Sequence, residues 1–106
     1  MQITVKDALN QLDGNGVQLF VKVMEHGNMS VEIYRPEKID RQTPHKQDEL
    51  YVVISGTGEF MNDCKLSVFK PGDVLFVRAG TDHRFVNYTD DFVTWVIFYG
   101  PNGGEK

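Results

Sequence analysis

The chain has 106 residues, enough for one domain with its own core, so we expect a single domain that spans residues 1–106. The 15 acidic and 11 basic residues give a net charge of −4 without a cluster of Lys or Arg, which excludes the pattern of a nucleic-acid-binding protein. No apolar run approaches a membrane span and no secretory signal is visible, so we expect a cytoplasmic protein that does not enter a membrane.

The first residues with a regular pattern, VKDALNQL at positions 5–12, predict a short helix. Asp7 is the expected N-terminal capping residue, because Asp favours that position. The cluster of Gly14, Asn15 and Gly16 predicts the end of the helix. Two helical turns are marginal on their own, so this helix depends on packing against the rest of the fold.

The chain then changes to an alternating pattern that predicts a β-hairpin. Residues Val17–Glu25 and Met29–Arg35 alternate apolar and polar side chains, and the HGN sequence between them predicts a tight turn. His26 lies in this turn, where we expect it to be exposed to solvent rather than to act as a ligand. In the second strand, Glu32 and Tyr34 share a face.

Residues 44–58 (PHKQDELYVVISGTG) follow an irregular connection at 36–44 and combine polar side chains with a strand-forming run. Side chains two apart on a strand share a face. One face is therefore expected to carry four polar or aromatic side chains and the other three aliphatic ones: His45, Gln47, Glu49 and Tyr51 against Leu50, Val52 and Ile54. An imidazole and a carboxylate on one face are ligand types that hold divalent metals in proteins.

Short strands and turns make up the rest of the chain. We expect strands at Glu59–Met61, Lys65–Phe69, Val74–Val77, His83–Asn87 and Phe92–Tyr99, separated by turns rich in Gly, Pro and Asn. Cys64, the only cysteine, lies in one of these turns, where an incidental role is favoured over a reactive thiol. The last residues, PNGGEK, are expected to be frayed. About eight short strands with hardly any helix predict a closed all-β sandwich or barrel.

The sequence GDVLFVRAGTDHRFVN, residues 72–87, resembles the second motif of the cupin superfamily. That motif has a glycine, five residues, a proline, one residue, a glycine, two residues, a histidine, three residues and an asparagine. Those positions hold Gly72, Arg78, Gly80, His83 and Asn87. Only the proline differs, since Arg78 replaces it.

The first cupin motif is His-x-His, three or four residues, Glu, six residues and Gly, and the central segment resembles it in part. Counting back from Gly56 places the glutamate at Glu49 and the second histidine at His45. Thr43 occupies the position of the first histidine, so half of the histidine pair is missing. Residues 57–71 separate the two motifs, and this short spacing is similar to that of small single-domain microbial cupins.

The resemblance implies an all-β cupin jelly-roll barrel that holds one divalent metal ion inside, near an open end. Its ligands transfer to His45, Glu49 and His83, a donor set that suits iron, manganese, zinc or nickel. Gln47 is a candidate fourth ligand through its amide oxygen; alternatively, it contacts a substrate or a bound water. Thr43 is not carried over as a ligand, because a neutral hydroxyl binds metals poorly.

Glu49 is also the expected catalytic residue, as a metal ligand and as a base. Burying its carboxylate without a cation or a donor costs on the order of several kcal/mol, which argues against a barrel that has lost its metal. Tyr51, Phe85 and Trp95 are candidates for lining a substrate pocket around the metal, with a plain core role as the alternative. Arg78 lies where it can attract an anionic substrate, and a solvated loop position is its alternative.

Three functional classes follow from these expectations. The first is a metal-dependent enzyme, such as a dioxygenase or a sugar isomerase, acting on a small molecule in the barrel. The second is a module that binds or senses a small-molecule ligand without turnover, and the third is a metal-free structural cupin. No second acid/base pair stands out in the sequence. The resemblance also implies a homodimer paired through the hairpin at Val17–Tyr34.

Overall fold

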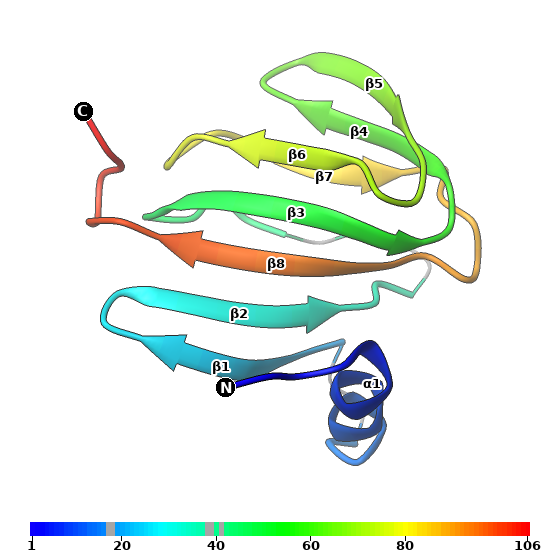
Figure 1. Ribbon diagram of the computed structural model, residues 1–106. Helices are drawn as coiled ribbons and strands as arrows, with labels where there is room; N and C mark the ends of the chain where they lie inside the picture. Colours follow the sequence, from blue (N-terminus) through cyan, green and yellow to red (C-terminus); the bar gives the residue numbers. More distant parts are fainter. Residues whose placement is uncertain (17–18, 38–39, 41) are drawn as a thin grey trace.

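The structure is a computed structural model that describes residues 1–16, 19–37, 40 and 42–106. Its strands form two antiparallel sheets, a five-stranded one in the order β1-β2-β8-β3-β6 and a three-stranded one in the order β5-β4-β7 (Figure 1). The elements are α1 Val5–Asp13, β1 Phe20–His26, β2 Met29–Tyr34, β3 Asp48–Ser55, β4 Gly58–Asn62, β5 Lys65–Phe69, β6 Val74–Val77, β7 His83–Val86 and β8 Val93–Tyr99. The predicted all-β barrel is confirmed, while the predicted start of the hairpin at Val17 lies outside the described residues.

The interior of the barrel is an aromatic core between the two sheets. Tyr51 and Val53 of β3 face inward and share one buried cluster with Phe60 of β4 and Phe85 of β7. The ring centroids of Phe60 and Phe85 lie 4.7 Å apart, and those of Tyr51 and Phe85 lie 4.9 Å apart. Because a fully buried Phe contributes about 1.5–3 kcal/mol, this core holds the two sheets in a fixed relation.

A second core lies outside the barrel, where α1 covers part of the outer face of the five-stranded sheet next to β1 and β2 (Figure 1). Ala8 and Leu12 of the helix pack against Val23, Ile33 and Val93 of the sheet. The helix thus gains the tertiary packing that its short length requires. In the part of the chain that the structure describes, no helix has the length and apolar character needed to cross a membrane.

The capping residue of α1 is Thr4, so the prediction of Asp7 was wrong. Thr4 has an extended backbone, and its Oγ1 accepts a hydrogen bond of 3.0 Å from the backbone N–H of Asp7. That bond satisfies one of the free donors of the first helical turn. Asp7 instead lies within that turn, where its negative charge is favoured by the helix dipole.

The hairpin of β1 and β2 turns at Gly27 and Asn28, and the positive φ of 58° at Gly27 is one that glycine adopts readily. His26 ends β1 and is exposed, as expected. On the outer face of the hairpin, Val23 and Ile33 are buried in the cluster formed with α1. One face of the hairpin is therefore partly covered by the helix, and the homodimer paired through the hairpin stays a prediction.

The C-terminal segment after β8 is bound to the barrel, which contradicts the predicted frayed end. The backbone N–H of Gly103 donates to Lys46 O at 2.7 Å, and that of Glu105 donates to the carboxylate of Asp48 at 2.9 Å. The Asp48 carboxylate also accepts the N–H of Ala79 at 2.9 Å. These two backbone donors, Glu105 first, hold the pKa of Asp48 below its ordinary value. A single buried carboxylate thus ties the last residues to the loop after β6.

Candidate metal centre

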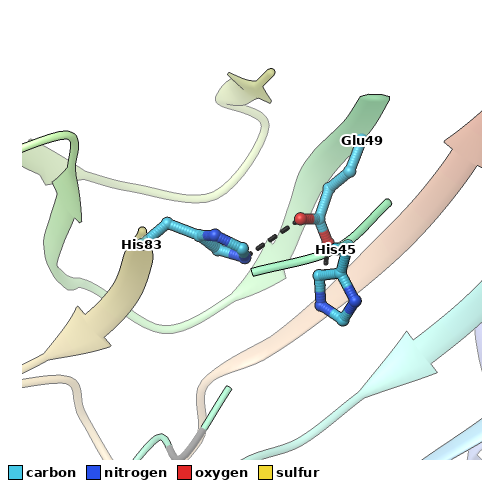
Figure 2. Close-up of side chains that lie close together, drawn as sticks. All are labelled: His45, Glu49 and His83. Atoms are coloured by element: carbon cyan, nitrogen blue, oxygen red, sulfur yellow. Dashed lines mark ion pairs between the residues drawn. The ribbon is translucent and has the colours of Figure 1, made fainter. Parts of the chain in front are cut away.

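Three of the predicted ligands converge although they come from distant parts of the chain (Figure 2). His45 lies in the connection before β3, Glu49 is the second residue of β3, and His83 is the first residue of β7. His83 Nε2 lies 3.0 Å from Glu49 Oε1, and His45 Nε2 lies 4.0 Å from Glu49 Oε2. One ligand atom from each residue lies within 4.8 Å of the other two. Both sheets therefore contribute to one compact group of donors.

The metal-facing atoms of this group are buried and make no hydrogen bond among the described residues. Nε2 of both histidines and both carboxylate oxygens of Glu49 have no hydrogen-bond partner among the described residues. His83 Nδ1 lies 2.8 Å from the Thr81 carbonyl, which can only accept, so the ring proton belongs on Nδ1. A neutral His83 then directs the lone pair of Nε2 at a carboxylate oxygen, an arrangement that repels unless a proton or a metal ion lies between them.

The chemistry of the donors fits a divalent metal ion. Buried polar groups are normally paired, and an unpaired buried carboxylate is costly. Two imidazoles and one carboxylate satisfy a transition metal and leave coordination positions open. The Thr81 carbonyl, which orients His83, is the kind of outer partner that metal-bound histidines use. The triad of His45, Glu49 and His83 can therefore bind a divalent metal.

The environment shifts the pKa of the two imidazoles in opposite directions. The pKa of His45 is lowered, chiefly by burial and also by His83, although Glu49 acts the other way. For His83, burial also acts to lower the pKa, but Glu49 and the Thr81 carbonyl together outweigh it, and the net shift is upward. His83 is thus the triad histidine that holds a proton more readily when no metal is bound.

Gln47, the fourth candidate ligand, is held by contacts outside the triad, and its coordination of a metal stays a prediction. The chain bends at Lys46 and Gln47, and the regular strand begins only at Asp48. The Gln47 amide nitrogen donates to the carbonyls of Asn28 at 2.6 Å and Gly100 at 3.0 Å. These contacts favour a structural role, which ties the hairpin turn to the C-terminal segment, over coordination of a metal.

Aromatic side chains close the barrel directly behind the triad. The ring centroids of Tyr51 and Phe60 lie 6.1 and 6.2 Å from that of His83, and Phe85 packs against both rings. All three aromatic side chains are fully buried. Tyr51 and Phe85 therefore form a solid floor to the site, which fits the core alternative, and their contact with a substrate stays a prediction.

Trp95 lies on the wrong side of the sheet for the pocket role predicted for it. In β8 it alternates with the inward-facing Val96, and it pairs with Ile33 of β2 and Val52 of β3. Its side chain packs in the outer cluster beneath α1. The prediction failed because both faces of β8 carry mainly apolar side chains, so its pattern does not reveal which face is inside.

The triad is reached from the side of His45. The His45 side chain is 34% exposed, whereas those of Glu49 and His83 are 1% and 0% exposed. A pocket of about 480 Å³ lies against it, lined by Pro44, His45, Lys46, Ala79, Gly80, Asn102 and Gly103. His45 is the one residue that both lines this pocket and belongs to the triad, as far as the described residues show. Arg78 is exposed, and among the described residues it is not part of the pocket wall.

Glu32 is an interior carboxylate whose relation to the site the sequence did not reveal. It pairs with Val96 of β8, which in turn pairs with Tyr51 of β3, so all three side chains face the barrel interior. Burial raises the pKa of Glu32, Lys22 opposes this shift, and the charge of Glu49 adds to it. The shared face of Glu32 and Tyr34 was visible in the sequence, but not that this face looks inward.

Two antiparallel sheets closed around an aromatic core, with two histidines and a glutamate at one end, define a small β-barrel with a candidate metal site. Residues 30–99 match the family model described as "Cupin domain", and the chain belongs to this family. An uncharacterised protein from Streptomyces coelicolor is 32% identical over 84 residues, which are 77% of this chain and 80% of that protein.

Solved structures are similar over most of the chain. A Cupin 2 conserved barrel domain protein from Salinispora arenicola CNS-205 has a TM-score of 0.70 at 20% identity, over 94% of this chain and 89% of that one. The cupin domain of an XRE family transcriptional regulator from Enterobacter cloacae has a TM-score of 0.63 at 20% identity, over 80% of this chain and 100% of that one. At these identities the likeness establishes the fold and leaves the activity open.

Proposed function

We propose that this protein is a metal-dependent cupin enzyme in which His45, Glu49 and His83 hold one divalent ion, drawn from iron, manganese, zinc and nickel. The observation that carries the proposal is the set of buried nitrogen and oxygen atoms of these three residues, which face one another and have no hydrogen-bond partner among the described residues. A cation at their centre would satisfy all of them at once. In a cupin that has lost its metal, burying Glu49 beside two imidazoles would cost free energy without a compensating interaction with a cation.

The residues of this chain prepare the site for such an ion. Thr81 holds His83 in the tautomer that presents Nε2, and Glu49 supplies the charge that offsets a cation. When bound, the ion supplies Lewis-acid activation of a ligand oxygen or activation of dioxygen, which are the chemistries of an isomerase and of a dioxygenase. The buried aromatic floor of Tyr51, Phe60 and Phe85 excludes water from one side.

The substrate is a small molecule that enters through the pocket beside His45 rather than from within the barrel. The interior behind the triad is filled by aromatic rings, whereas the pocket opens to solvent and has His45 among its lining residues. Glu32 favours an enzyme over a passive binding module, because it is a carboxyl group on the inner face of the barrel whose pKa burial raises, and such groups are common among residues that transfer protons.

Metal content of the purified protein tests this proposal. Wild type should carry close to one ion per chain by elemental analysis, and His83→Ala and Glu49→Gln should each lose most of it. His26→Ala is the matched control, because His26 is an exposed histidine on β1 that is not part of the triad. Equal metal content in wild type and His83→Ala would overturn the ligand assignment.

A second measurement separates an enzyme from a binding module. The metal-loaded wild type is offered a panel of small oxygen-bearing substrates, and both product formation and oxygen uptake are followed. Turnover that disappears in His83→Ala supports the enzyme. Saturable binding of a panel member without any turnover would instead support the binding or sensing alternative.

A further inference from the structure

Asp40 is a buried carboxylate in the connection between β2 and β3, and the site described above does not use it. Its side chain accepts four hydrogen bonds from described residues, and only 5% of the residue is exposed. The donors are the Tyr34 hydroxyl at 2.7 Å, the Phe85 N–H at 2.7 Å, the Gln42 N–H at 3.1 Å and the Gln42 amide nitrogen at 2.9 Å. Four charge-assisted bonds on one buried group indicate a fixed structural element.

Two of these donors belong to different sheets. Tyr34 ends β2 in the five-stranded sheet, and Phe85 lies in β7 at the edge of the three-stranded sheet. A strand at a sheet edge leaves backbone groups on one side without a strand partner. The Asp40 carboxylate accepts a hydrogen bond from one such group, the Phe85 N–H, and it also accepts one from the Tyr34 hydroxyl. Its side chain thus joins the edge of the three-stranded sheet to the five-stranded sheet.

Gln42 extends this contact to β3. Its amide nitrogen donates to Asp40, and its amide oxygen accepts a hydrogen bond of 2.7 Å from the Tyr51 hydroxyl. Both ends of the amide are therefore engaged, which fixes its orientation. The network thus runs from β7 through Asp40 and Gln42 to β3.

The ends of this network lie next to the metal ligands. Phe85 is two residues after His83 in β7, and Tyr51 is two residues after Glu49 in β3. The Tyr51 ring also lies 6.1 Å from the His83 ring. Since His83 and Glu49 come from different sheets, their separation depends on whatever fixes β7 against β3. The aromatic core packs the two sheets together without directional preference, whereas hydrogen bonds add defined distances between particular atoms.

We propose that Asp40 is a positioning residue of the metal centre, which sets the separation of His83 and Glu49 by binding β7 directly and β3 through Gln42 and Tyr51. The inference rests on the proposed function, since it concerns the affinity of the same site. Partners outside the ligand set that orient metal ligands typically change metal affinity by about 10- to 100-fold when they are replaced.

The test measures Co²⁺ binding to metal-free protein by competition with a chromophoric chelator, together with the visible spectrum of the Co²⁺ complex. Asp40→Asn keeps the size of the side chain but replaces one carboxylate oxygen with an NH₂ group. That group cannot accept a hydrogen bond from the donors that now contact the oxygen. We expect about 10- to 100-fold weaker Co²⁺ binding and an altered spectrum, since the spectrum reports ligand geometry. Tyr51→Phe removes only the hydroxyl group that donates to Gln42. It should also weaken Co²⁺ binding and alter the spectrum.

Phe92→Leu is the control for a general loss of stability. Phe92 is buried in the same aromatic core but lies against Gly56, at the end of β3 opposite to Glu49. The free energy of unfolding of the Phe92→Leu protein should fall, while its Co²⁺ affinity and the spectrum of its Co²⁺ complex should stay those of wild type. This contrast separates positioning of the ligands from stability alone.

The possible results distinguish the two proposals. If wild type binds Co²⁺ but Asp40→Asn and Tyr51→Phe bind it with wild-type affinity and spectrum, the role of Asp40 is overturned and the metal site stands. If Asp40→Asn does not fold, Tyr51→Phe alone decides, because it leaves the Asp40 carboxylate in place. If wild type binds no metal, the proposed function fails and this inference fails with it.

Discussion

Nε2 of His83 lies 3.0 Å from Oε1 of Glu49, while the Thr81 carbonyl holds the opposite nitrogen of the same ring. In a neutral imidazole the only N–H donates to this carbonyl, so the two facing atoms, Nε2 and Oε1, are both acceptors. A positive species has to lie between them, either a second ring proton or a metal ion. This relationship links the metal affinity, the pH dependence and the stability of the protein.

Metal affinity is expected to fall as the pH is lowered, because each histidine must lose a proton before it can ligate. The raised pKa of His83 makes protons compete first at that residue, and the lowered pKa of His45 delays competition there to a more acidic pH. Zn²⁺ affinity measured by chelator competition at several values between about pH 5 and pH 8 should show this. An affinity that is constant over that range would contradict the assignment of the two histidines.

Glu49→Gln should destabilise the metal-free protein more at acidic than at alkaline pH. The pKa of His83 is raised in the fold, so the stability from its ion pair with Glu49 is fully present below the unfolded pKa and is lost as the pH rises through the folded pKa. Denaturant unfolding of both proteins at about pH 5 and pH 8 checks this. A destabilisation that is larger at the higher pH would contradict the pairing.

Glu32→Gln should retain the metal and lose turnover. Removing a carboxyl group that transfers a proton typically lowers the rate by about 10²- to 10⁴-fold, while the ligands of the ion are untouched. Because burial raises the pKa of Glu32, the same change should also stabilise the fold above the ordinary pKa of a glutamate. Glu37→Gln, at an exposed position, is the control for loss of one charge. Wild-type turnover in Glu32→Gln would exclude Glu32 from the reaction.

Thr4→Ala should lower the free energy of unfolding by about 0.5–2 kcal/mol, because it removes the capping bond to the Asp7 N–H. Asp7→Asn should cost less, about 0.3–1 kcal/mol, since it removes only a favourable charge in the first turn. Thermal or denaturant unfolding of both variants makes the comparison. The reverse order would support Asp7 as the cap.

The strands could be predicted closely from the sequence, because alternation and turn residues are local signals. The predicted strands Lys65–Phe69 and Val74–Val77 have the observed bounds, and β7 and β8 differ by one residue at one end. The motifs likewise placed His45, Glu49 and His83 in one group, which the structure brings together. Both kinds of signal depend on spacing along the chain.

What the sequence could not give depends on contacts between distant segments. The bend at residues 46 and 47 could not be predicted because nothing local marks it; the amide nitrogen of Gln47 donates there to the carbonyls of Asn28 and Gly100. Asp40 was passed over because its donors come from two strands and a neighbouring residue. An irregular segment carries no periodicity from which such contacts can be read.

The bound C-terminal segment has a practical consequence for handling the protein. Asn102 and Gly103 line the pocket beside His45, whereas Met1 is fully exposed beside β1 (Figure 1). A polyhistidine tag fused after residue 106 would therefore lie near the pocket, where its imidazoles would compete with the triad for the metal ion used in the assay. A cleavable tag at the N-terminus avoids that artefact.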